Sequence, residues 1–206
     1  AMAGWKTTDM LNGIDGIMNL AAASGENLAL VSDICTDAMT AFGLSADQSA
    51  RFADVLAAAS SNANTNVAML GESFKYVAPV AGAMGYSVED TAVALGLMAN
   101  SGIKASQAGT SLRQILLGLQ GGVELATKST DNWRIEVENS DGSMRNLNDV
   151  VVDLRAAFAD MTDAQKASNA EAIAGKIGMS GLLAIVNAAE TDFNKLTGAI
   201  DKSNGV

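Results

Sequence analysis

The side chains that could do chemistry in this sequence fall in three short stretches: Glu89-Asp90, Asp141-Gly142 and Gly175-Lys176. The first is a pair of carboxylates of the kind that shares general acid–base work. The second is typical of a calcium-binding loop, and the third of a loop that binds phosphate. The sequence contains no His, so histidine-based acid–base catalysis, His-activated nucleophiles and His-bound zinc are excluded.

The first stretch has a structural explanation, and the other two depart from the motifs that they suggest. We therefore predict no catalytic, cofactor-binding or metal-binding residue. Glu89 and Asp90 follow Ser87, which places them in the first turn of a helix, where acidic side chains complement the helix dipole. The regular acidic spacing of a calcium loop is absent before Asp141. Ile177 stands where a phosphate loop requires Ser or Thr. No carboxylate pair stands out as that of a cell-wall hydrolase, so we predict that the protein is not an enzyme.

The segments around these side chains are predicted to be helices, because capping residues mark their starts. Ser45–Gln48 and Thr162–Gln165 have the capping-box pattern, and Thr8 and Ser87 are expected N-caps. Apolar residues at spacings of three and four follow these starts. The predicted fold class is all-α, a compact multi-helix array of short capped helices with at most one short β-hairpin.

The hairpin is expected at residues 134–146. Trp133–Val137 alternates apolar and polar residues, as a short strand does. Asn139–Gly142 is turn sequence, so Ser143–Arg145 is placed to return antiparallel, with a bulged loop as the alternative. A lone hairpin is marginal in water, which requires this one to lie against helices.

The hairpin divides the chain into three parts. Residues 1–130 form a helical region that contains the Gly/Ala-rich core helices, and residues 131–146 form the hairpin or loop. Residues 147–206 form C-terminal helices that pack on the first region. The whole chain is expected to be a fragment of a longer protein.

Three breaks inside the helical segments are expected from residue type. Pro79 removes a backbone donor and crowds the preceding turn, so it either bends one helix or separates two. Ser60–Asn66 is polar and rich in Asn, which predicts a loop. The helix that begins near Thr162 is expected to end at Gly175, with Gly178–Ser180 as a turn before the next apolar run.

Small residues recur four apart on helical faces that should pack. Such pairs share a face and let another backbone come close. The pairs are Ala78/Gly82, Ala92/Gly96 and Ala105/Gly109. We therefore expect Gly96 and Gly109 to lie at buried helix–helix contacts. Gly13 and Gly16 should weaken the first helix by about 1 kcal/mol each if they are exposed.

Composition narrows the function classes further. The formal net charge is −10, and direct nucleic-acid binding is not expected because it depends on Lys and Arg. No uncharged apolar run reaches the roughly 18 residues that a membrane span needs, and Thr91–Ile103 is the nearest candidate. Cys35 is the only cysteine, which excludes an internal disulfide, and its place in an apolar stripe predicts a buried thiol.

Three long runs resemble the conserved region of phage tail tape-measure proteins: SSNANTNVAMLGESFKYVAPVAGAMGYSVEDTAVALGLMANSGIKASQAGTSLR, SDGSMRNLNDVVVDLRAAF and GKIGMSGLLAIVN. The resemblance extends from about Gly4 to about Leu196. It implies a structural component of a phage or prophage tail, in the virion tail and in the host cytoplasm during assembly. Such a protein sets tail length and assists tail assembly and DNA delivery. It offers no catalytic residues to carry over.

The resemblance implies other tail proteins as partners: the tube, the tip or initiator, and assembly chaperones, with self-association as a further option and no cofactor. A ruler segment should be one uninterrupted helix, whereas this chain breaks about every fifteen residues, a normal globular helix length. We therefore expect a compact structural section of the longer protein. The alternatives are a helical adaptor or assembly module of another large complex, or a membrane-active segment used in DNA ejection, which only the Gly/Ala-rich faces support.

Overall fold

A computed structural model describes residues 5–125 and 133–203 of the chain. Within these residues the structure is helical apart from one short two-stranded sheet, which confirms the all-α fold class. The helices are α1 (Thr7–Ser24), α2 (Leu28–Ala41), α3 (Ser49–Asn62), α4 (Val67–Ala83), α5 (Val88–Asn100), α6 (Ala105–Gly118), α7 (Leu147–Ala159), α8 (Asp163–Val186) and α9 (Glu190–Ser203). A 3₁₀ turn, Ala46–Gln48, precedes α3, and the strands are β1 (Val123–Leu125) and β2 (Trp133–Ile135).

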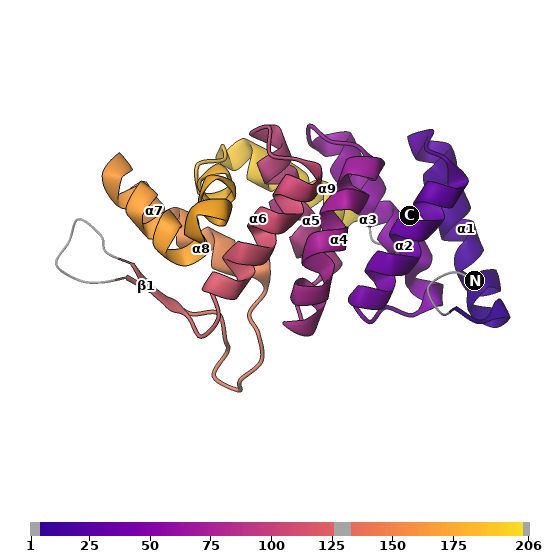
Figure 1. Cartoon of the computed structure of the whole chain (residues 1–206), viewed down its shortest axis with the longest axis horizontal. Coiled ribbons are helices and arrows are strands. Elements are labelled where there is room, and N and C mark those ends of the chain that lie inside the picture. The colour runs from indigo at the N-terminus through magenta and orange to yellow at the C-terminus, as the bar shows by residue number, and fades with distance from the viewer. Residues whose placement is uncertain (1–4, 126–132, 204–206) are drawn as a thin grey trace.

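The helices form two layers (Figure 1). In the even layer, α2, α4, α6 and α8 lie side by side, and in the odd layer α1, α3 and α5 do the same. At one end of the array, α7 packs against α5 and α8. The last helix, α9, returns and packs against α3 and α5. Neighbours within a layer are therefore separated in sequence by a helix of the other layer.

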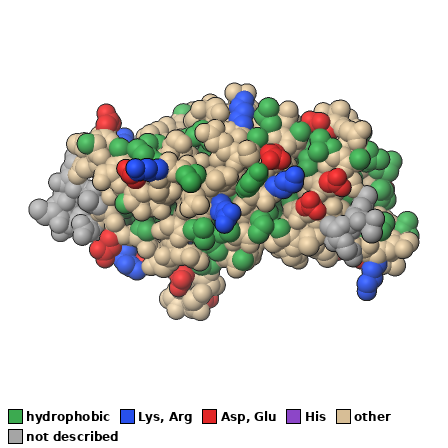
Figure 2. All heavy atoms as spheres, in the orientation of Figure 1, with side chains coloured by type: hydrophobic (Ala, Val, Ile, Leu, Met, Phe, Trp, Pro, Cys, Tyr) green, Lys and Arg blue, Asp and Glu red, His purple; other side chains and the backbone are tan. Residues whose placement is uncertain are grey.

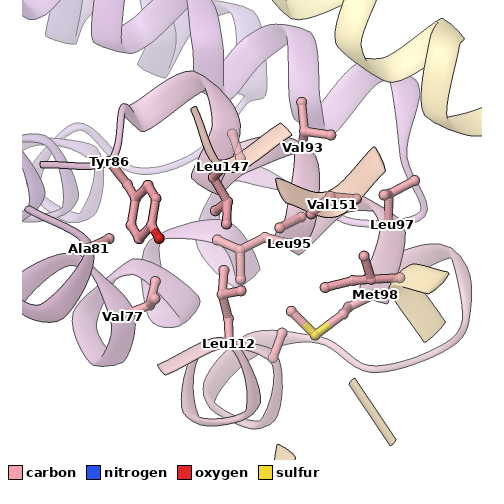
Figure 3. Packing of buried hydrophobic residues seen from close by; sticks show 14 of the residues in the cluster. Val77, Ala81, Tyr86, Val93, Leu95, Leu97, Met98, Leu112, Leu147 and Val151 are labelled. Carbon is pink, nitrogen blue, oxygen red and sulfur yellow. The ribbon is translucent and has the colours of Figure 1, made fainter. Parts of the chain in front are cut away.

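The apolar core lies between the layers. Figure 3 shows one part of it, where Val77 of α4, Leu95 of α5 and Leu112 of α6 meet. The most enclosed helix is α5, in which every residue except Asp90 and Asn100 is buried. Burying a Leu or Val side chain contributes about 1.5–3 kcal/mol, so α5 is an apolar centre for the helices that pack against it, which are α3, α4, α6, α7, α8 and α9.

Three of the four predicted capping residues are found at helix starts. Ser87 Oγ accepts the N–H of Asp90 at 3.1 Å at the start of α5, and the predicted capping boxes before α8 and in the 3₁₀ turn are both formed. Thr8 was the wrong cap for α1. The helix begins at Thr7 and its N-cap is Lys6, whose N–H donates to Asp9 Oδ2 at 2.9 Å.

The predicted breaks are partly displaced. Only residues 63–66 form the expected loop, because α3 continues to Asn62, whose side chain donates to a carbonyl of the preceding turn at 2.9 Å. Pro79 lies inside one continuous helix, α4. The predicted break at Gly175 is present within α8, with φ 63° and ψ 179°. The turn predicted at Gly178–Ser180 is wrong, since these residues are helical.

In the sheet, β2 pairs with β1, the strand that precedes it in the sequence. The two strands are antiparallel, with β1 preceding the predicted hairpin. The return strand expected at residues 143–145 forms only an isolated bridge, between Glu138 and Met144. We did not predict β1 because three residues are too few to reveal an alternating pattern. Ile135 of β2 is fully buried, and β2 contacts α7, so the sheet lies against helices as expected.

Helices approach closely at small residues, as predicted. Gly96 and Gly109 are both buried. A Cβ on Gly96 would lie 2.5 Å from Cδ2 of Leu196, and one on Gly109 would overlap the carbonyl oxygen of Ser73. The position of Gly109 therefore requires glycine, because a larger residue would displace the α4 backbone, whereas at Gly96 the neighbour is the end of the Leu196 side chain.

Further glycines have the same role. A neighbouring helix or its flanking turn occupies the space of a Cβ at Gly16 of α1, Gly82 of α4, Gly118 of α6 and Gly181 of α8. The weakening expected of exposed glycines does not apply to Gly13 and Gly16, because both are buried. The glycines at these four positions therefore mark contact sites.

Two acidic residues at the start of α5 connect it to neighbouring helices. Glu89 is buried, and its carboxylate pairs with Arg51 of α3 at 2.6 Å. Asp90 Oδ2 accepts the N–H of Asn148 in the first turn of α7 at 3.4 Å. Burial raises the pKa of Asp90 above its ordinary value, while hydrogen bonds from the N–H groups of Asn148 and Leu147 oppose that rise. Both carboxylates are first-turn residues, as predicted. In addition, Glu89 binds α3 and Asp90 binds α7.

Gly109→Ala should lower the free energy of unfolding by about 1–3 kcal/mol, because the added carbon overpacks against the α4 backbone. Gly198→Ala in α9 is the matched control, since a Cβ there meets no heavy atom within 4 Å. That change should stabilise the protein by up to about 1 kcal/mol. Urea unfolding measures both, and a Gly109→Ala protein as stable as wild type would contradict the close-packing argument.

Asp90→Asn should stabilise the protein at about pH 7, because it keeps an acceptor for α7 and removes a partly buried charge. A carboxyl whose pKa is raised by folding costs stability when ionised, and this cost disappears as the pH falls through the folded pKa. The gain should therefore shrink as the pH is lowered to about 4, which urea unfolding at each pH would measure. Asp90→Ala also loses the acceptor and should be less stable than the Asn variant throughout. A gain in stability of the Asn variant that does not change with pH would contradict this explanation.

Candidate interaction surface

The side chains singled out for chemistry lie in separate elements. Glu89 is buried in α5, and Gly175 is exposed at the break in α8. Asp141 lies in a surface turn, where its Oδ1 accepts from the N–H of Ser143 at 3.0 Å and from its hydroxyl at 2.6 Å. Within residues 5–125 and 133–203, no three His, Cys, Asp or Glu side chains are grouped so that they could hold a metal ion.

Two buried groups have strongly shifted pKa values. Cys35 is fully buried, as predicted, and burial raises the pKa of its thiol to about 12. Burial likewise raises the pKa of the Tyr86 hydroxyl to about 12. Figure 3 shows the Tyr86 ring among apolar side chains, and the hydroxyl has no hydrogen-bond partner in the part of the chain that the structure describes. Both groups are therefore un-ionised at neutral pH, which makes Cys35 a poor nucleophile.

A groove with a volume of about 470 Å³ lies between α2 and α4. Its walls are formed by residues between Leu30 and Ala41 of α2 and between Ala68 and Pro79 of α4. At a rise of 1.5 Å per residue, each wall is about 16 Å long, or three helical turns. The hollow is therefore a trough that runs along both helices, on the surface of the even layer.

The floor of the groove is apolar and consists mainly of small side chains. Its buried residues are Ile34, Ala38, Gly71, Phe74 and Ala78. Gly71 allows α4 to pack directly against Ile34, whose side chain occupies the space of a Cβ at that position. The small residues leave space above them, which is why the surface is hollow here.

The rim of the groove is mainly acidic. Asp33 and Asp37 are exposed one turn apart on α2, and Glu72 lies on the α4 wall. Lys75, the one cation of the lining, pairs with Glu72 at 3.8 Å. Asp33 and Asp37 make no ion pair within the described residues. Figure 2 shows acidic side chains over α2 and α4 on this face of the molecule.

We did not predict the groove, because α2 and α4 are neighbours only through the layered fold. Each helix has an apolar face and at least one acidic residue that is not buried, a pattern that is common on surface helices. Only the adjacency of the two helices turns these features into a groove. No signal in the sequence reports that adjacency.

The length and apolar character of the helices bear on whether they could span a membrane. No single helix in residues 5–125 and 133–203 is long and apolar enough to cross a membrane, whereas α8 and α9, which meet at 90°, pass the test as a bent pair. Ile185, Leu196 and Ile200 of this pair are buried in the core.

Comparison with known proteins places the chain among phage proteins. It is 35% identical, over 205 residues and all of its own length, to the tape measure protein of Pneumococcus phage Dp-1. It is 28% identical, over 191 residues and 91% of its own length, to the probable tape measure protein of Escherichia phage P2. The chain spans only 18% and 23% of these two relatives.

No solved structure matches the chain. The family described as phage-related minor tail protein matches residues 1–175. Because this match covers most of the 206 residues, the chain belongs to the phage-related minor tail protein family.

Proposed function

We propose that this chain is a folded structural module within a tail tape-measure protein. The family match and the two relatives named tape measure protein support the assignment. The observation that carries the proposal is the two-layer array itself, with one apolar core built from helices far apart in sequence. A chain folded in this way acts through its surfaces, whereas a ruler acts through its extended length.

The length that the chain can span distinguishes a folded module from a ruler segment. A single continuous helix of 206 residues would be about 310 Å long. The described helices are instead 13 to 24 residues long and return on one another. The module therefore adds little to a length measurement, and it serves assembly by packing in the tail initiator or tip, or by contacting other tail proteins.

The proposed role is non-enzymatic. The module acts in the virion tail, after assembly in the host cytoplasm, and supports the setting of tail length and DNA delivery by the longer protein. Its partners are tail proteins of the tube, tip or initiator, together with assembly chaperones. The formal charge of −10 disfavours direct contact with the DNA that passes through the tail.

The test is an in-frame deletion of this segment from the parent gene, followed by electron microscopy of the tails. We expect either no tails or tails whose length changes by far less than about 310 Å. The matched control deletes an equally long stretch of uninterrupted predicted helix from the same gene, and it should shorten the tails by about that amount. If deletion of the folded segment shortened the tails as much as the control does, the segment would be part of the ruler.

A further inference from the structure

The groove between α2 and α4 has the dimensions of a helix-binding site. Its walls run for about three helical turns, and its apolar floor is bounded by polar rims on both sides. Amphipathic helices bind such grooves by inserting side chains spaced three, four and seven residues apart. The small floor residues Ala38 and Ala78 leave room for these side chains.

The polar groups of the rim are mainly acceptors. Asp33, Asp37 and Glu72 contribute carboxylates, and the only cation, Lys75, is paired with Glu72. Pro79 adds a further acceptor because it has no N–H, so the carbonyl of Lys75, four residues earlier, lacks its usual helical partner. A molecule that fills this groove must therefore bring hydrogen-bond donors and positive charge.

We propose that the groove binds an amphipathic helix of another tail protein, in which two Lys or Arg residues four apart flank an apolar face. The cations pair with Asp33 and Asp37, which are themselves four apart on α2. The apolar face covers the small-residue floor. The proposal depends on the proposed function in one respect, namely that the partner belongs to the tail.

A second copy of this chain does not fit the groove. None of its 13 Lys and Arg residues lies three or four positions from another, so no helix of this chain presents two cations one turn apart. The chain is also strongly acidic, so a second copy would bring negative charge to a negative rim.

The test is site-specific photo-crosslinking in the full-length parent protein, in cells that produce the phage. The crosslinker replaces Thr40, an exposed residue of the groove lining. The matched control places it at Thr8, which is exposed on α1 outside the groove. We expect Thr40 to capture one tail protein, at a helical segment with Lys or Arg residues four apart, and Thr8 not to capture it.

Charge variants identify the cause of the capture. Asp33→Asn with Asp37→Asn should reduce the Thr40 crosslink roughly tenfold, because both pairing carboxylates are lost. Asp160→Asn with Asp201→Asn makes the same change in net charge at exposed sites away from the groove and should leave the crosslink unchanged. Thermal unfolding of both double variants should match wild type, which separates lost binding from lost folding.

Several results would overturn the proposal. They are capture of a second copy, capture of an acidic or non-helical segment, a crosslink that the Asp33/Asp37 variant leaves unchanged, and a Thr40 pattern identical to that of Thr8. Capture of a basic helix from a protein outside the tail would instead support the groove chemistry and contradict the proposed function.

Discussion

Contact between helix backbones is the constraint on which this structure depends. Each layer contains glycines that face a neighbouring helix directly: Gly16 towards α3, Gly82 towards the end of α2, Gly109 towards α4 and Gly118 towards α8. Aromatic residues make up only 4% of the sequence, so large rings cannot fill wide spaces between helices. Close approach is the alternative, since dispersion attraction weakens steeply over less than 1 Å. The short distances then fix the position of each helix along its neighbour.

The features that could be predicted from the sequence are those that depend on nearby residues. A cap such as Ser87 acts within one turn, so a few residues suffice to locate it. The Gly/Ala pairs of α5 and α6 were predicted for the same reason, because spacing along one helix defines a shared face. The fold class followed from repeated features of this kind.

The features that could not be predicted depend on which helices become neighbours. Gly175 and Gly178 look alike in sequence, yet Gly175 has a positive φ at a break in α8, whereas Gly178 packs against Gln114 of α6. Asp90 has the position of an ordinary first-turn acid, and only the placement of α7 makes it an acceptor for another helix. The acidic groove has the same origin, since its walls belong to helices separated by α3.

The return of α9 has a mechanical consequence. The first helix, α1, and the last, α9, both pack against α3. A pull applied at the two ends of the described chain would therefore load these contacts, along a line from α1 through α3 to α9. The helices from α4 to α8 are not part of this line and would carry less of the force. The even-layer helices α4, α6 and α8 would then keep their shape while the rest of the chain is stretched.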